Sequence, residues 1–97
     1  MSRNEIINTL SGHKTKLEDI FGVSSIALFG SSVRDEATPA SDIDLLVEFK
    51  KGHKDFFNFI RCKLYLEEVF GRKVDLVMKS AVKSRIRKQI YNQAEYV

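Results

Sequence analysis

The sequence has 97 residues, of which 43% are hydrophobic and 30% are charged, and its formal net charge is +3 at pH 7. This composition is that of a soluble globular protein, and the length fits one domain over residues 1–97. The single cysteine, Cys62, excludes an internal disulfide and a cysteine-rich zinc cluster. No apolar run reaches the roughly 18 residues of a membrane helix, and the polar start does not resemble a signal peptide. We therefore expect a cytoplasmic protein without a membrane segment.

The first predicted element is a helix that ends at Phe21. Ser2 and Glu5 have the spacing of a capping box, and Gly22 is typical of the residue that follows a helix. Apolar residues recur on one stripe of this helix, at Ile6, Leu10, Leu17 and Phe21. The next segment, 26–29, is short and apolar on both faces and is followed by Gly30, which predicts a strand in the middle of a sheet.

Four more elements follow in the second half of the chain. A strand is predicted over 43–49 and another over 74–78. Between them, 56–70 has a wide apolar helical face and ends at Gly71; its apolar positions are Phe56, Phe59, Ile60, Leu64, Leu66 and Val69. A last helix is predicted from Ser80, with Val82, Ile86 and Ile90 on one side and basic residues around the rest.

These elements predict an α/β (α+β) fold with a small mixed sheet of about three strands packed against helices. The expected order is α-β-α-β-α-β-α, in which a short helix follows the first strand. Residues 95–97 could extend the sheet by a further strand.

The loop after the first strand has the composition of a phosphate-binding loop. Gly30 allows a sharp turn and a close approach of the backbone to a ligand. The amides and hydroxyls of Ser31 and Ser32 supply donors to phosphate oxygens. Both serines would also suit an ordinary turn, so the sequence leaves that alternative open.

Three aspartates are the candidate metal ligands. Asp42 and Asp44 lie two residues apart at the start of the second strand, so the pleat directs both to one side. Two converging carboxylates favour a bound cation, and oxygen ligands favour Mg²⁺. Asp75 interrupts the apolar third strand and would reach the same site if the second and third strands are neighbours. A solvent-facing position is the alternative for Asp75.

The order Gly-Ser, ten residues, Asp-x-Asp and a later carboxylate resembles the nucleotidyltransferase superfamily related to DNA polymerase beta. The sequence is most similar to the minimal nucleotidyltransferases (MNT) of the antitoxin type. The matching residues are Gly30, Ser31, Arg34, Ala37, Ser41, Asp42, Ile43, Asp44, Leu45 and Asp75, and the chain end near Tyr96 and Val97 is also alike. Asp35 stands where the group usually has glycine, which adds a negative charge beside the phosphate loop.

This resemblance implies an activity, a metal and a partner. It implies two Mg²⁺ ions held by Asp42, Asp44 and Asp75, and AMP transfer from ATP to a hydroxyl. The nucleotide-binding residues would be Gly30, Ser31, Ser32, Arg34 and Ser41. The acceptor that the resemblance implies is a tyrosine of a HEPN-domain toxin. The predicted elements offer no second domain for an acceptor pocket, so we expect the acceptor to come from another molecule.

Other interpretations stay open at this stage. Arg34 could form an internal salt bridge instead of contacting phosphate. The basic segment 79–88 lacks interleaved aromatic residues, so we do not expect direct nucleic-acid binding and read it as a solvated helix face or a partner surface. The chain could also be a catalytically silent module that occludes a HEPN partner, or a stand-alone enzyme that modifies a small molecule. The sequence does not decide whether the chain forms homo-oligomers.

Overall fold

The computed structural model describes residues 2–30, 33 and 42–97. Its helices and strands, in chain order, are α1 (Arg3–Phe21), β1 (Val23–Leu28), β2 (Ile43–Phe49), α3 (Phe56–Phe70), β3 (Val74–Met78), the 3₁₀ turn η1 (Lys79–Ala81), α4 (Ser84–Gln93) and β4 (Glu95–Tyr96). The mixed α/β class is confirmed. The short helix expected after the first strand falls within residues 31–41, of which the structure describes only Val33.

One sheet of four strands organises the molecule, in the order β3-β2-β1-β4. Strands β2 and β3 are parallel, whereas β1 is antiparallel to both β2 and β4. The sheet is therefore mixed, as predicted, and the segment 95–97 does extend it. Tyr96 and Glu95 pair with Ala27 and Leu28, and the amide of Val97 donates a hydrogen bond of 3.0 Å to the carbonyl of Ile26.

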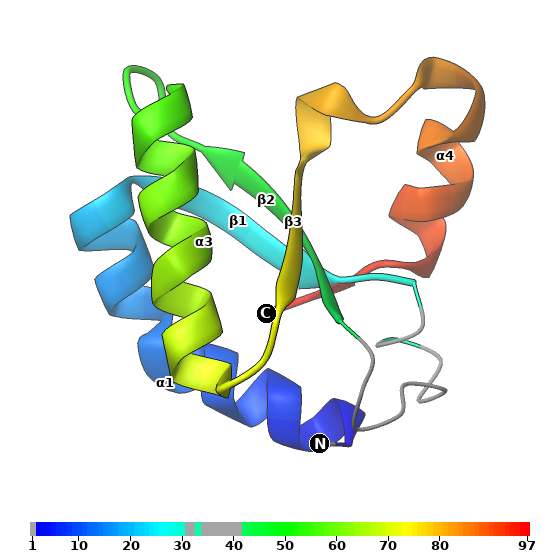
Figure 1. Ribbon diagram of the computed structural model, residues 1–97. Helices are drawn as coiled ribbons and strands as arrows, with labels where there is room; N and C mark the ends of the chain where they lie inside the picture. The colour runs from blue at the N-terminus through cyan, green and yellow to red at the C-terminus, as the bar shows by residue number, and fades with distance from the viewer. Residues whose placement is uncertain (1, 31–32, 34–41) are drawn as a thin grey trace.

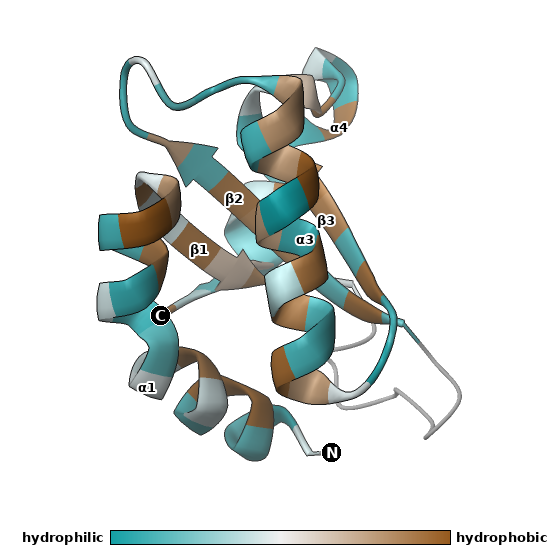
Figure 2. Cartoon of the chain, turned by 60° about the vertical axis from the view of Figure 1, so that its left-hand side comes forward, coloured by the Kyte–Doolittle hydropathy of each residue, from teal (hydrophilic) through white to brown (hydrophobic). Residues whose placement is uncertain are grey.

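The helices lie on both faces of the sheet. Helices α1 and α3 lie side by side on one face, whereas α4 stands apart from them beyond the other (Figure 1). Brown, hydrophobic segments run along much of β1, β2 and β3 and recur as bands on α1 and α3 (Figure 2). The main core contains fifteen buried side chains, among them Leu10, Leu17, Ile26, Leu45 and Leu66. A smaller cluster around Ala27, Leu46 and Val82 fills the space beneath α4.

The ends of the first helix follow the sequence signals. Both hydrogen bonds of the capping box between Ser2 and Glu5 are present, at 3.2 and 3.0 Å. Gly22 forms the carboxyl-terminal cap and donates its amide to the carbonyl of Glu18. Because both helix ends satisfy their own backbone groups, local sequence fixes where α1 begins and ends.

Helix α3 has the predicted bounds but buries a different face. Its buried residues recur every four positions, at Asn58, Cys62, Leu66 and Phe70. The prediction that Phe56 and Leu64 belong to the core face is wrong, since they are 69% and 57% exposed. Cys62 is fully buried, and burial raises the pKa of its thiol to about 12. A thiol in this state stays neutral and serves as a core residue.

Asn58 explains part of the difference between the predicted and the observed buried face of α3. Its side-chain amide donates hydrogen bonds to the carbonyl oxygens of Phe21 and His53, at 2.7 and 2.8 Å. It thereby ties the start of α3 to the end of α1. A buried amide with two partners is stable inside a core, whereas composition alone marks asparagine as a surface residue.

The last helix begins later than predicted. The sequence indicated a helix from Ser80, but a 3₁₀ turn covers Lys79–Ala81 and α4 starts at Ser84. Val82 and Lys83, between these elements, have extended backbones with ψ of 128° and 138°. This extension lets Val82 reach the small cluster, where it is buried. Tertiary burial has therefore overridden the helical spacing of the apolar residues.

Lys79 contacts residues of both α4 and β4. Its ammonium lies over the rings of Tyr91 and Tyr96, 4.8 and 5.1 Å from their centroids. The Tyr91 hydroxyl donates a hydrogen bond of 2.9 Å to the Lys79 carbonyl. The hydrogen bond to Tyr96 raises the pKa of Lys79. These contacts join η1 to α4 and β4.

Candidate functional site

Asp44 and Asp75 face each other across two neighbouring strands. They are register partners in the parallel pair β2 and β3. Paired residues on adjacent parallel strands point to the same face, about 4.8 Å apart. The condition that the sequence left open, that the second and third strands are neighbours, is therefore met. Asp44 is half-buried and Asp75 is exposed.

The alternation along the strands places this pair on the α4 side of the sheet. Ile43 and Leu45, on either side of Asp44, belong to the main core against α1 and α3. Leu46 and Val77, two residues beyond each aspartate, belong to the small cluster beneath α4. The two carboxylates therefore stand at the strand starts, on the face that α4 only partly covers.

Asp42 lies directly before β2 and is exposed. Along an extended chain it lies on the same side as Asp44. Within the part of the chain that the structure describes, no three acidic, histidine or cysteine side chains already converge as ligands for a metal ion. The fold thus brings the backbones of the aspartates together, without a closed cluster of side chains.

Gly30 lies against the side chain of Asp44. Its φ of 62° is in the left-handed region, and a Cβ atom added here would meet the Asp44 carboxylate. The preceding amide, that of Phe29, donates a hydrogen bond of 3.1 Å to the Asp44 carbonyl. The start of the predicted phosphate loop is therefore fixed beside the acidic pair. Of the other predicted nucleotide-binding residues, Ser31, Ser32, Arg34 and Ser41 lie outside the described residues.

Two adjoining cavities form a groove between α4 and the sheet, and both are lined by Phe29, Ile86 and Ile90. The larger cavity, of about 390 Å³, also contacts Asp75. Sequence analysis did not assign these three apolar residues to a site. The only signal was the four-residue spacing of the two isoleucines, which equally predicts a core helix.

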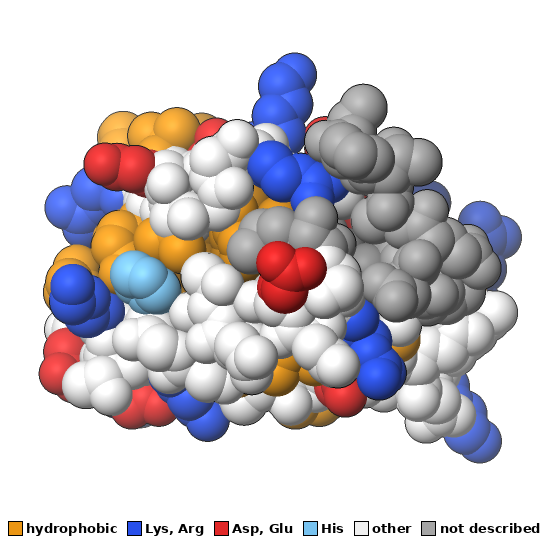
Figure 3. Space-filling view, turned by 90° about the horizontal axis from the view of Figure 1, so that it is seen from below, with side chains coloured by type: hydrophobic (Ala, Val, Ile, Leu, Met, Phe, Trp, Pro, Cys, Tyr) orange, Lys and Arg blue, Asp and Glu red, His pale blue; other side chains and the backbone are white. Residues whose placement is uncertain are grey.

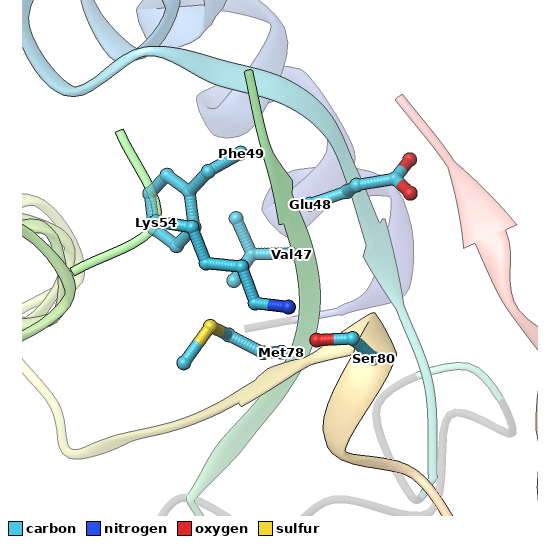
Figure 4. Close-up of a pocket in the computed structure, with 6 residues that line it drawn as sticks. All are labelled: Val47, Glu48, Phe49, Lys54, Met78 and Ser80. Atoms are coloured by element: carbon cyan, nitrogen blue, oxygen red, sulfur yellow. The ribbon is translucent and has the colours of Figure 1, made fainter. Parts of the chain in front are cut away.

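A separate depression of about 120 Å³ lies at the other end of β2. Figure 4 shows its lining, which includes Glu48, Lys54 and Ser80. Because β2 begins beside Asp44 and runs away from it, this depression does not contain the aspartates. It has one acidic and one basic side chain instead of a group of carboxylates.

The two histidines stand apart from the aspartates. His53 is exposed. His13 is half-buried, and its Nδ1 lies 2.6 Å from the hydroxyl oxygen of Tyr65. Its ring also meets the ring of Tyr65 edge to face. His13 therefore helps to join α1 to α3.

Among the helices of the described residues, none combines the length and the apolar character that a membrane span requires.

Comparison with known proteins agrees with this geometry. The chain matches the nucleotidyltransferase domain family over residues 10–97. It is 43% identical over 97 residues to the protein adenylyltransferase MntA of Thermococcus cleftensis, which covers 100% of this chain and 97% of that protein. The structure resembles that of a protein proposed to be a minimal nucleotidyltransferase, with a TM-score of 0.82, 31% identity, and coverage of 100% of this chain and 95% of that one.

A more distant structure has the same fold. It is a chain from the structure of a tri-AMPylated HEPN toxin of Shewanella oneidensis in complex with an MNT antitoxin. The TM-score is 0.58 at 23% identity, and the match covers 97% of this chain and 66% of that one.

The chain therefore belongs to the nucleotidyltransferase family, and within it to the minimal nucleotidyltransferases. It is an enzyme of the nucleotidyltransferase class.

Proposed function

We propose that this chain transfers AMP from ATP to a hydroxyl group of a partner protein, in a reaction that depends on Mg²⁺. The observation that carries the proposal is the register pairing of Asp44 with Asp75, next to Gly30. A nucleotidyl transfer needs a place for the triphosphate and a group of charges around the α-phosphorus. In this proposal the triphosphate lies at the end of β1, and the charges around the α-phosphorus come from the starts of β2 and β3.

The donor set fits Mg²⁺. Asp42, Asp44 and Asp75 offer only carboxylate oxygens, which this ion prefers, and two like charges across one strand pair repel each other unless a cation lies between them. Two bound Mg²⁺ ions would neutralise phosphate charge and lower the pKa of the attacking hydroxyl. The residues that would hold the triphosphate are Gly30, Ser31, Ser32, Arg34 and Ser41.

The positions of Asp44 and Asp75 suggest a different role for each. Asp44 stands between the phosphate loop and the third strand, so it orients the α-phosphate. Asp75 is more exposed and lies farther from Gly30, so it receives the acceptor. Catalysis then rests on positioning and on neutralising charge, with no covalent intermediate.

The partner we propose is a HEPN-domain toxin, with a tyrosine as the acceptor and an antitoxin role for this chain. Support comes from the name of the Thermococcus relative, a protein adenylyltransferase, and from the fold shared with a chain of a HEPN toxin and MNT antitoxin complex. A partner that brings its own hydroxyl also suits the shallow groove beside Asp75.

Calorimetric titration of the purified chain with ATP tests the first half of this proposal. Binding is expected with Mg²⁺ and not with EDTA, since the carboxylates repel the triphosphate without a cation. Titration with GTP measures the preference for the base. Binding that is unchanged by EDTA, or no binding in Mg²⁺, would contradict the proposal. A chain that inhibits its partner without binding ATP would instead act by occlusion.

A further inference from the structure

The groove between α4 and the sheet has two chemically different halves. Both share the apolar side chains Phe29, Ile86 and Ile90. One half, of about 300 Å³, adds Gly30 and the amides of Gln89 and Gln93. The other half adds a carboxylate, three small or apolar residues and two basic ones: Asp75, Val77, Ala81, Val82, Lys83 and Arg85. We call this second half the β3 groove.

The order of the strands places Gly30 in one half and Asp75 in the other, with Asp44 between them. Gly30 follows β1, Asp44 lies on the central strand β2, and Asp75 lies on β3. The phosphate loop and Asp75 are thus on opposite sides of Asp44. Nucleotidyl transfer is an in-line displacement in which the attacking and leaving oxygens lie on opposite sides of the phosphorus. If the triphosphate lies at Gly30, the attacking hydroxyl arrives from the β3 side.

Strand β3 is also an edge of the sheet. Among the described residues, no strand pairs with the outer side of β3, from which the β3 groove would be entered. A segment of another protein therefore has access to the groove from this edge.

Apart from Asp75, the charged side chains of this region are basic. Residues 76–94 contain five basic side chains and no acidic one, namely Lys79, Lys83, Arg85, Arg87 and Lys88. Helix α1, in contrast, has three basic residues, Arg3, Lys14 and Lys16, and three acidic ones, Glu5, Glu18 and Asp19. Figure 3 shows blue and red side chains interspersed on the face seen from below. The basic field at α4 is therefore a local property of the groove wall.

We propose that the β3 groove binds an acidic segment of the partner protein that carries the acceptor hydroxyl beside an apolar side chain. The apolar side chain packs against Phe29, Ile86 and Ile90, and the acidic residues meet Lys83 and Arg85 at the rim. The hydroxyl then lies at Asp75. This assignment rests on the proposed function and specifies the chemistry of the substrate.

The transfer step follows from this placement. The acceptor hydroxyl oxygen forms a bond to the α-phosphorus as the bond from that phosphorus to the oxygen bridging to the β-phosphate breaks. Pyrophosphate leaves with the electron pair of the broken bond. The hydroxyl proton passes to the Asp75 carboxylate and then to solvent, so that one ATP and one hydroxyl give one AMP ester and one pyrophosphate.

Two groove variants and two matched controls test the assignment. Ile86→Glu puts a charge on the groove wall, and Leu64→Glu puts the same charge on an exposed apolar position of α3, where the groove is not affected. Lys83→Glu with Arg85→Glu reverses the rim charge. Lys16→Glu with Arg61→Glu makes the same change at exposed positions of α1 and α3.

The probe is a fluorescent peptide with one tyrosine flanked by leucine and glutamates, and a second peptide has lysine in place of each glutamate. Fluorescence anisotropy is measured with Mg²⁺ and a non-hydrolysable ATP analogue. The parent should bind the acidic peptide at least about tenfold more tightly than the lysine peptide. In both groove variants, the affinity for the acidic peptide should fall by about tenfold or more. The two controls should change by less than about twofold. Affinity for MgATP should not change in the rim-charge variant or in either control, because their residues do not line the half of the groove that contains Gly30.

Three results overturn the assignment: equal binding of the two peptides, equal losses in Ile86→Glu and Leu64→Glu, or no loss in either groove variant. Loss of MgATP affinity in Ile86→Glu with the peptide still bound would overturn it too, since the β3 groove would then hold the nucleoside. A parent protein that fails to bind MgATP contradicts the proposed function itself. The two failures are therefore distinguished by the nucleotide titration.

Discussion

The carboxylate of Asp44 lies directly against Gly30: a Cβ atom placed on that glycine would stand 2.6 Å from Oδ2 of Asp44. Any other residue at position 30 must displace the carboxylate. The phosphate loop and the metal ligands are thus joined by contact, in addition to their proximity in the sequence.

Gly30→Ala should therefore weaken MgATP binding by about tenfold or more, because the methyl group turns the Asp44 carboxylate away. The left-handed φ adds a folding cost of about 1 kcal/mol. Gly71→Ala is the matched control, since Gly71 has nearly the same φ, 64°, and open space around its Cα. It should lose similar stability and keep its affinity for MgATP. Equal affinities in the two variants would show that the contact has no role in binding.

Asp42→Asn combined with Asp44→Asn should remove Mg²⁺-dependent ATP binding and leave the fold intact. Both substitutions keep the size of the side chain and remove charges that repel each other without a metal. Calorimetry measures the binding, and circular dichroism checks the fold. If the double variant binds MgATP as tightly as the parent, these aspartates are not the metal ligands.

Asp75→Asn should separate binding from chemistry. Because Asp75 lies on the acceptor side, nucleotide affinity should stay within a few fold, while transfer falls by about a hundredfold or more. Single-turnover assays with labelled ATP measure transfer, and calorimetry measures affinity. A variant that loses both in the same proportion would place Asp75 with the nucleotide.

Asn58→Ala should destabilise the protein by about 1–3 kcal/mol, since it removes the buried hydrogen bond to the Phe21 carbonyl and one of the two donors to the His53 carbonyl. Asn8→Ala is the control, because Asn8 is exposed on α1. It should change stability by less than about 0.5 kcal/mol. Urea unfolding gives both values. Equal effects would mean that the amide does not hold the two helices together.

Much of the fold can be predicted from local signals. The capping box at Ser2 and the glycines after α1 and α3 give the helix ends, and apolar runs give β2 and β3 within their observed bounds. What fails is set by tertiary packing. Phe56 and Leu64 have apolar side chains at helical spacing but face solvent, since the buried face of α3 presents Asn58 to the Phe21 carbonyl at the end of α1.

The candidate site follows the same division. Asp42, Asp44 and Asp75 are found from their type and spacing, and the expected strand neighbours do bring the last two together. Sequence does not reveal that Gly30 packs on Asp44, because that contact depends on how β1 ends beside β2. The apolar groove beneath α4 is equally hidden, since the late start of that helix at Ser84 cannot be read from its apolar spacing.

Intact-mass spectrometry tests the central claim most directly. The chain is incubated with a candidate HEPN-domain partner, ATP and Mg²⁺, and the masses of both proteins are measured. We predict that the partner gains one or more AMP units, and that Asp44→Asn abolishes this gain while leaving the two proteins able to associate. A partner that stays unmodified, yet is bound and inhibited, would contradict the transfer mechanism and establish occlusion in its place.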